Sequence, residues 1–402
     1  MMPRDRSTPV TPGNRSFVDR NRPALLEQEL LTLYRPDLAQ ALAAASVPAY
    51  RYTQVLEHLF RRPLASFAQA TALPGEWREQ LDQLGASTLD VTAERTAPDG
   101  TKKFLLRTRD GHHVESVLMT YRDRVTACIS SQIGCPVGCA FCATGTLGFK
   151  RNLTVAEIVD QVRLAAREAA ASGRRLSNLV YMGMGEPLLN VGAVLDSIRI
   201  LTDPRALGLG HRSISVSTIG IPRGILRLAT VEPQVNLALS LQAADDRTRA
   251  LLIPDKFRHP LAEILEACWR HFRLTHRKLL VEYLLLGSLN DSPGDARRLA
   301  RLLRGHVVTV NLIPWNPVSA PDGRALQPLG QPASAPATRP ARAGQRPARG
   351  RTLSFTTPTP AALAAFRQIL VEAGVETVVR ESKGASIEAA CGQLAGRVGS
   401  YS

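Results

Sequence analysis

Apolar and polar residues follow two alternating periods along the middle of the chain. Short apolar runs typical of buried strands are each followed by a stretch in which apolar residues recur every three or four positions, as on one helix face. The expected strands are residues 179–182, 213–217, 235–240, 278–285, 307–313 and 375–379. The expected helices are residues 156–171, capped by Thr154, and 192–201, 222–229, 260–272, 293–304 and 361–373.

This alternation with short connections predicts an α/β fold in which helices cover a parallel sheet. A closed barrel, an incomplete barrel and a doubly wound sheet all fit the pattern. Ahead of it, residues 103–107, 114–118 and 125–129 alternate in strand fashion. We therefore expect the main domain to span residues 99–381, with a short C-terminal tail at 382–402.

The N-terminal quarter of the chain has a different pattern. Residues 1–22 are polar and rich in Arg and Pro, which predicts a disordered basic tail. Within residues 23–98, apolar residues recur at helical spacing in 24–33, 52–60 and 77–84. This predicts a small helical accessory domain, which serves either as a packing cap or as an RNA-binding appendage.

Residues 319–352 interrupt the strand–helix alternation. They are rich in Pro, Ala, Gly and Arg and contain almost no bulky apolar side chains. One acid, Asp322, accompanies six arginines: Arg324, Arg339, Arg342, Arg346, Arg349 and Arg351. This composition predicts a flexible basic insertion. It is either a solvated loop or a contact to RNA phosphates.

Composition and charge narrow the class of protein. At 44% hydrophobic residues, the 402-residue chain can bury a sizeable core. Its net charge of +15 indicates a polyanionic partner, RNA or DNA first, although a genome that favours Arg would produce the same surplus. The start, residues 1–10, is polar, and the most apolar stretch, 279–289, is short and contains Glu282. We therefore predict a cytoplasmic protein without a membrane segment.

Three of the six cysteines are closely spaced in the segment from Gly134 to Gly145. Cys135, Cys139 and Cys142 form a C-x3-C-x2-C pattern, which can bind three irons of a [4Fe–4S] cluster and leave the fourth iron open to a substrate. The alternative is zinc, with His112 or His113 as fourth ligand. Structural zinc sites usually pair two C-x2-C knuckles, and the chain has no second one, so the spacing favours iron–sulfur.

These motifs resemble the RlmN/Cfr family of radical S-adenosylmethionine (SAM) RNA methyltransferases. The resemblance runs from about residue 114 to 393, apart from the basic insertion. The matching segments are Cys128-Ile-Ser-Ser-Gln-Ile-Gly-Cys135, Phe141-Cys-Ala-Thr-Gly145, Gly183-Met-Gly-Glu-Pro-Leu-Leu-Asn190, Ser215-Val-Ser-Thr-Ile-Gly220, Asn311-Leu-Ile-Pro-Trp-Asn-Pro317 and Ala389-Ala-Cys-Gly-Gln-Leu394. The family fold is an incomplete (βα) barrel with an N-terminal accessory domain.

The resemblance implies a reaction and roles for three residues. The family methylates a carbon of adenine in ribosomal RNA, and RlmN members also modify transfer RNA. By similarity, Cys391 takes a methyl group from one SAM and forms S-methylcysteine. A second SAM, bound on one [4Fe–4S] cluster, gives the radical that activates this methyl group. Glu115 then accepts the ring proton, and Cys128 resolves the intermediate through a transient disulfide with Cys391.

The same resemblance assigns cofactor contacts and partners. Residues that match the family's SAM contacts are Gly185, Glu186, Ser217, Ser240, Leu241, Gln242 and Asn316. The expected partners are RNA and a reducing electron donor such as flavodoxin or ferredoxin, and the expected state is a monomer. Cys268, on an apolar helix face, is interpreted as a core residue.

Two departures from the family pattern leave alternatives open. Gln242 stands where the family usually has His, and Gly384-Ala-Ser-Ile387 replaces an acidic run ahead of the methyl-carrying cysteine. Methylation at C2, as in RlmN, is favoured, but two segments are closer to Cfr, which methylates C8 and confers antibiotic resistance. Other classes are a radical SAM enzyme with a non-RNA substrate and a non-catalytic iron–sulfur or zinc RNA-binding protein. Cys391, Cys128 and Glu115 argue against pure binding.

Overall fold

The computed structural model describes residues 25–61, 66–318 and 355–396 of the chain. The predicted N-terminal tail and the basic insertion lie outside the described residues. The expectations for these two segments therefore stay predictions.

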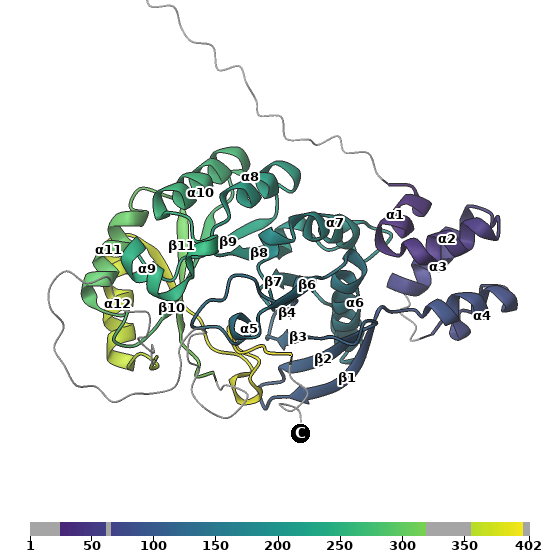
Figure 1. Ribbon diagram of the computed structural model, residues 1–402, viewed down its shortest axis with the longest axis horizontal. Helices are drawn as coiled ribbons and strands as arrows, with labels where there is room; N and C mark the ends of the chain where they lie inside the picture. Colours follow the sequence, from purple (N-terminus) through teal and green to yellow (C-terminus); the bar gives the residue numbers. More distant parts are fainter. Residues whose placement is uncertain (1–24, 62–65, 319–354, 397–402) are drawn as a thin grey trace, which may run out of the picture.

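A ten-stranded sheet forms the centre of the molecule (Figure 1). Its first four strands pair antiparallel: β1 (Leu89–Thr96), β2 (Lys102–Thr108), β3 (His113–Thr120) and β4 (Val125–Cys128). From β4 onward the strands pair parallel: β7 (Asn178–Tyr181), β8 (Ile214–Thr218), β9 (Asn236–Ser240), β10 (Leu279–Leu285), β11 (Val308–Pro314) and β12 (Glu376–Val379). Because β1 and β12 are the two edges, the sheet does not close, which confirms the incomplete barrel.

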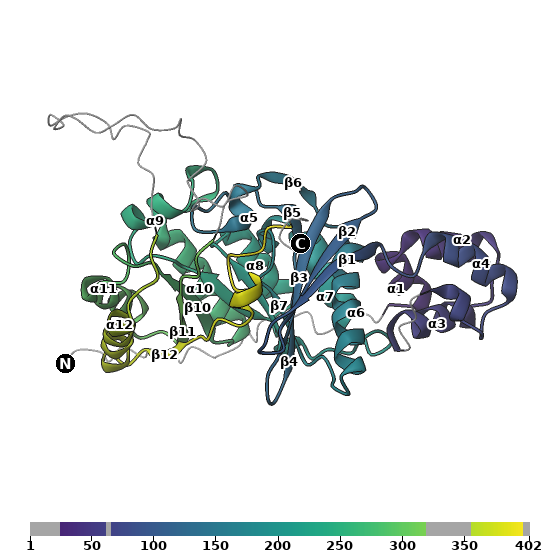
Figure 2. The same ribbon diagram turned by 90° about the horizontal axis from the view of Figure 1, so that it is seen from below.

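Helices cover the outer face of the parallel strands (Figures 1 and 2). They are α6 (Val155–Ala171), α7 (Val191–Thr202), α8 (Pro222–Val231), α10 (Leu261–Thr275), α11 (Pro293–Leu303) and α12 (Pro360–Glu372). Helix α9 (Asp246–Leu252) packs instead against the cysteine-rich segment, where the Leu252 carbonyl accepts a hydrogen bond from the Ala140 N–H. Local signals start several of them: Thr154 forms a capping box with Glu157 at α6, and Ser292 forms one with Asp295 at α11. Every predicted strand–helix pair of this region is confirmed, whereas α9 was not predicted.

A two-stranded sheet outside the barrel carries the cysteine motif. Strand β5 (Gln132–Gly134) pairs antiparallel with β6 (Phe149–Asn152), and the short helix α5 (Ala143–Thr146) lies between them. The cysteine motif connects β5 to α5, so both ends of its loop are fixed by hydrogen-bonded structure.

The N-terminal helices form a separate layer at one end of the barrel (Figure 2). They are α1 (Glu27–Tyr34), α2 (Pro36–Ala44), α3 (Tyr50–Leu56) and α4 (Gly75–Leu84). Residues 89–96, grouped above with this helical segment, instead form strand β1 of the main sheet. The polar–apolar alternation of β1 is weak because its side chains are mostly exposed at a sheet edge.

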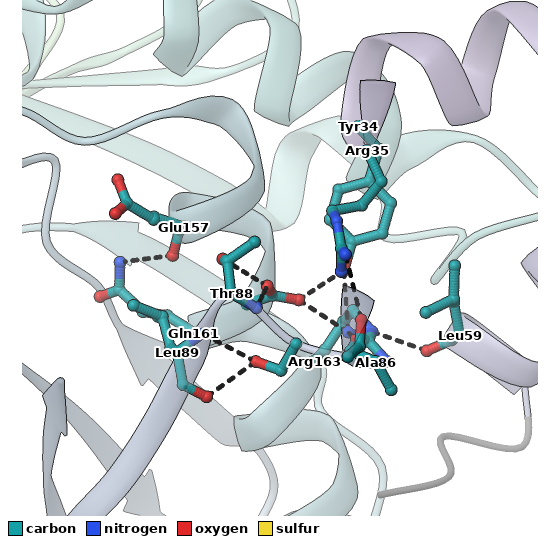
Figure 3. A network of polar contacts seen from close by, with 12 residues as sticks. Tyr34, Arg35, Leu59, Ala86, Thr88, Leu89, Glu157, Gln161 and Arg163 are labelled. Atoms are coloured by element: carbon teal, nitrogen blue, oxygen red, sulfur yellow. Dashed lines mark hydrogen bonds and ion pairs between the residues drawn. The ribbon is translucent and has the colours of Figure 1, made fainter. Parts of the chain in front are cut away.

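A buried polar network joins this helical layer to α6 (Figure 3). The Asp160 carboxylate accepts hydrogen bonds from the Tyr34 hydroxyl, from the backbone and side chain of Thr88, both at 2.7 Å, and from Arg163 at 2.7 Å. Arg163 also donates to the carbonyls of Leu59 and Ala86 at 2.7 and 2.6 Å. One ion pair thus connects α6 with three separate parts of the N-terminal segment.

No helix within the described part of the chain is long and apolar enough to cross a membrane.

Candidate active site

A cavity opens at the carboxyl ends of the parallel strands. It is lined by residues at the ends of β4, β7, β8, β9, β10 and β11, by the cysteine loop, and by residues 380–394 of the C-terminal segment. Side chains at this edge of a barrel converge because all parallel strands end there. The cavity therefore brings together residues that lie more than 250 positions apart in the sequence, from Met119 to Leu394.

The three motif cysteines line this cavity together. Their loop is held by backbone hydrogen bonds from Cys135 to Gly148 and from Ala140 to Leu252, at 3.0 and 2.9 Å. Gly134 permits the entry to the loop, because its φ is +70° and a Cβ there would lie 1.8 Å from the Gly148 carbonyl oxygen. Burial, with a smaller contribution from the neighbouring Cys142 thiolate, raises the pKa of the Cys135 thiol to about 12.

The loop offers a donor set of three thiols. Cys135, Cys139 and Cys142 line the cavity together, whereas His112 and His113 are absent from its lining. Among the described residues, no group of three His, Cys, Asp or Glu side chains is arranged to hold a metal ion. Three soft thiolates without a histidine beside them in the lining suit the irons of a [4Fe–4S] cluster.

Beside the cysteines, the cavity has polar groups suited to a small polar ligand. Nδ2 of Asn316 is buried without a hydrogen-bond partner in the protein, so a bound ligand could satisfy it. Glu186 is almost fully buried, and this burial raises its pKa to about 7, although the backbone N–H groups of Ile219 and Leu188 oppose the shift. Gly185, with φ at +100°, passes the Gln132 side chain so closely that a Cβ would meet it at 2.6 Å.

Most of the expected SAM contacts reach the cavity. Its lining includes Gly185, Glu186, Ser217, Ser240, Gln242 and Asn316. Leu241 is the exception: it is buried in the core and absent from the lining. The amide of Gln242 is oriented by the backbone N–H of Leu284, which donates to its Oε1 at 2.9 Å. Nε2 of Gln242 is therefore the group that can donate to a ligand.

Cys128 and Cys391 line the same cavity although 263 positions separate them (391 − 128). Cys128 ends β4 and is nearly buried. Burial, with a smaller contribution from the nearby Cys391 sulfur, raises the pKa of its thiol to about 12. The Cys391 residue is exposed, although protein atoms surround its thiol. Desolvation by these atoms raises the pKa of the thiol, and the Arg380 guanidinium opposes the shift.

Glu115 lies behind the cavity, on β3, and does not contribute to its lining. Its carboxylate is fully buried and forms an ion pair with Lys103 at 3.2 Å. It also accepts hydrogen bonds from the backbone N–H groups of Ala395 and Gly396, at 2.6 and 3.0 Å. In this conformation Glu115 therefore anchors the end of the C-terminal segment.

The cavity also contains a buried acid–base pair that the motifs did not indicate. Glu282 in β10 accepts hydrogen bonds from Asn311 at 2.8 Å and from Arg380 at 3.4 Å, and burial raises its pKa. A lone carboxylate in the apolar run from Leu279 to Leu285 was the available signal, because an unpaired charge is rarely buried. Cys268, by contrast, is fully buried in the core, as expected.

Comparisons with known proteins agree with this site. The Radical SAM superfamily model matches residues 129–303, and that superfamily works with a [4Fe–4S] cluster and SAM. A probable dual-specificity RNA methyltransferase RlmN from Heliobacterium modesticaldum is 42% identical, covering 92% of this chain and 89% of that protein. The dual-specificity RNA methyltransferase RlmN from Anaeromyxobacter dehalogenans is 40% identical, covering 92% of each chain.

A solved structure gives the same relationship. The crystal structure of a radical SAM methyltransferase from Sphaerobacter thermophilus is similar to this chain with a TM-score of 0.79 and 40% identity, covering 93% of this chain and 98% of that one. Fold and sequence therefore agree over nearly the whole length. The chain therefore belongs to the RlmN family of radical SAM RNA methyltransferases.

Proposed function

We propose that this enzyme methylates C2 of an adenine in ribosomal RNA, and also in transfer RNA, through a methyl group carried on Cys391. The observation that carries the proposal is the cavity itself. It brings together the three cysteines of the cluster loop, Cys128 and Cys391, from separate parts of the chain. A fold that only bound RNA or a cluster would not need the last two thiols at this point.

The roles of the two thiols follow from their positions. The Cys391 thiolate would attack the methyl carbon of one SAM, so that a new S–CH3 bond forms and S-adenosylhomocysteine leaves, since a thiolate is a good nucleophile for this step. Cys135, Cys139 and Cys142 would hold the cluster, and the bound cluster with a second SAM would supply the radical chemistry that methylation of an electron-poor adenine carbon requires. Cys128, on the neighbouring wall of the cavity, then attacks the Cys391 sulfur, so that the methylated base is released as a disulfide forms.

Side chains in and behind the cavity are proposed to bind SAM and to accept the proton of the adenine ring. Glu186, Asn316 and the Nε2 group of Gln242 would bind the polar groups of SAM. Glu115 is proposed to accept the proton of the adenine ring. For this the N–H groups of Ala395 and Gly396 have to leave its carboxylate, so the end of the C-terminal segment moves during the reaction.

Four further expectations belong to this proposal. The relatives' names include dual specificity, which supports more than one RNA target. A flavodoxin or ferredoxin would supply the electron for the cluster, and two SAM molecules would be used in each turnover. We propose that the enzyme acts as a monomer. Methylation at C8, as in Cfr, is the competing outcome. The identity of the methylated nucleoside distinguishes C2 from C8 methylation.

The test is to identify the product in cells that lack their own enzyme of this type. We expect RNA nucleosides, separated against standards and measured by mass spectrometry, to contain 2-methyladenosine when the wild-type chain is expressed. Cys391→Ala should abolish the product. Cys268→Ala, a matched thiol in the core, should retain it. A product that elutes as 8-methyladenosine would reassign the position. Absence of methyladenosine from a preparation that cleaves SAM would contradict an RNA substrate.

A further inference from the structure

Arg249 lies at the centre of α9 and is fully buried. Its guanidinium donates only to backbone carbonyls. Nε binds the Leu241 carbonyl at 3.3 Å, and the terminal nitrogens bind the carbonyls of His259, at 3.0 Å, and Ile219. In the described part of the chain no carboxylate lies within ion-pair distance of it. A buried cation of this kind is rare, because desolvation of a charge is costly unless an opposite charge offsets it.

Two acidic groups act on the Arg249 charge: first the Cys139 thiolate of the cluster loop, and then Asp246 of α9, which lies beyond ion-pair distance. The loop and α9 are joined by the hydrogen bond from Ala140 to the carbonyl of Leu252, the last residue of α9. Apolar side chains of both segments pack in one cluster that includes Val137, Cys139 and Leu252. Burial lowers the pKa of Arg249 to about 10, and the Cys139 thiolate opposes this shift. The guanidinium thus stays charged at neutral pH, close to the thiols.

Arg249 does not reach the SAM side of the cavity. It is absent from the cavity lining, so a contact with substrate does not explain its charge. The backbone of Ile219 lies between Arg249 and Glu186: its carbonyl accepts from Arg249, while its N–H donates to Glu186 at 2.9 Å. Glu186 and Arg249 are therefore connected through the backbone of one residue, and only the acid lines the cavity.

We infer that Arg249 is a positioning residue whose buried charge offsets the negative charge of the cluster and favours its reduction. This inference rests on the proposed assignment of the cluster to Cys135, Cys139 and Cys142. Three thiolates and an oxidised [4Fe–4S] core with two positive charges leave one negative charge. Uptake of one electron from a low-potential reductant adds a second, and no bond is made or broken at Arg249. A fixed cation beside the loop stabilises the more negative state, and net charge is one determinant of cluster potential.

The test uses the full-length enzyme with its cluster reconstituted anaerobically. Arg249→Met removes the charge, Arg249→Lys keeps it, and Arg258→Met is the matched control. Arg258 binds carbonyls of the same region, those of Ala250 and Ile253, but forms an ion pair with Asp255. Iron content and circular dichroism report assembly and fold. Titration with dithionite, followed by electron paramagnetic resonance, reports the reduction equilibrium without any RNA substrate.

We expect Arg249→Met to lower the ratio of reduced to oxidised cluster at a fixed potential by about tenfold, which corresponds to about 59 mV for one electron. Arg249→Lys should stay close to the wild type, and Arg258→Met should not change. A folded Arg249→Met with full iron content and an unshifted equilibrium would overturn the inference. If Arg249→Met loses its cluster, Arg249→Lys decides. An Arg249→Lys protein that keeps the cluster and its reduction potential supports the role of the charge. An Arg249→Lys protein that loses both overturns the inference. A wild-type chain that binds no iron would overturn the cluster assignment and this inference with it.

Discussion

Asn316 and His271 each have a buried side-chain nitrogen without a hydrogen-bond partner in the protein. Asn316 faces the cavity, so its free Nδ2 is available to a ligand. His271 lies on the inner face of α10, away from the cavity, with its Nε2 buried and unpartnered. No ligand is expected to reach His271, and its imidazole therefore has to stay neutral in the folded state. An unpartnered nitrogen is thus open to a ligand at Asn316, whereas at His271 it is a cost to stability.

His271 should make the enzyme sensitive to acid. Burial, and then the charge of Arg277, lowers its pKa from 6.5 to about 4. Because the unfolded chain binds the proton more readily, the stabilisation is complete above pH 6.5 and is lost as the pH falls towards 4. The difference of about 2.5 units corresponds to roughly 3 kcal/mol.

Urea unfolding at pH 7, 5.5 and 4 would measure this effect. His271→Leu fills a similar space and cannot titrate, so it should lose less stability than the wild type over this range, by roughly 3 kcal/mol. Parallel pH curves for the two proteins would show that another group dominates acid unfolding.

At the scale of elements, α6 connects the barrel to the N-terminal helices. Asp160 and Arg163 of α6 contact the N-terminal segment at Tyr34, Leu59 and Thr88 (Figure 3). Both charges are buried, so each depends on the other and on the surrounding hydrogen bonds. This network fixes the position of the helical layer relative to the active site, whether the layer is a cap or an RNA-binding appendage.

Asp160→Asn should weaken this junction strongly. The substitution leaves the Arg163 charge buried without its partner, and breaking a buried pair costs about 3–5 kcal/mol. We expect faster amide hydrogen exchange in residues 27–56, with little change in the parallel strands. Asp90→Asn is the control, because its pair with Arg107 is exposed and is worth less than about 1 kcal/mol. Equal exchange in both variants would mean that apolar packing alone holds the layer.

At the scale of the whole molecule, the C-terminal segment closes the cavity and carries Cys391. Its anchors come from distant parts of the chain. The Gly384 N–H donates to Asp99 at 3.1 Å, the Thr144 hydroxyl donates to the Leu394 carbonyl at 2.6 Å, and Glu115 accepts from Ala395 and Gly396. Asp99 thus contributes an acid next to the segment in which the family's usual acidic run is missing.

Glu115→Gln separates the anchoring role of this carboxylate from its proposed role as proton acceptor. The amide keeps one acceptor oxygen but loses the charge that pairs with Lys103 and attracts two N–H donors. We expect hydrogen exchange in residues 388–396 to accelerate at least fivefold, a change of about 1 kcal/mol. Glu168→Gln, which removes an acid paired with Lys102, should leave this segment unchanged. Unaltered exchange in Glu115→Gln would show that the other anchors suffice.

The cluster loop and the alternating elements could be predicted from the sequence because their determinants are local. The spacing of Cys135, Cys139 and Cys142 lies within eight residues, and hydrophobic periodicity is set by neighbouring positions. Capping residues such as Thr154 mark helix starts for the same reason. Strand β1 and helix α9 were not predicted, because the hydrophobic periodicity of an exposed edge strand and of a short helix is weak.

Only the tertiary structure decided which distant residues meet. Cys128 and Cys391 line one cavity because the C-terminal segment returns across the ends of the parallel strands. Leu241 lies in the core and Glu115 binds the returning segment, although the family resemblance implied a SAM contact for the first and a proton-accepting role for the second. Arg249 acquires its unusual environment from the packing of α9 against the cluster loop. Local patterns specify elements and ligand spacing, whereas contacts across long separations depend on how the sheet brings its strands together.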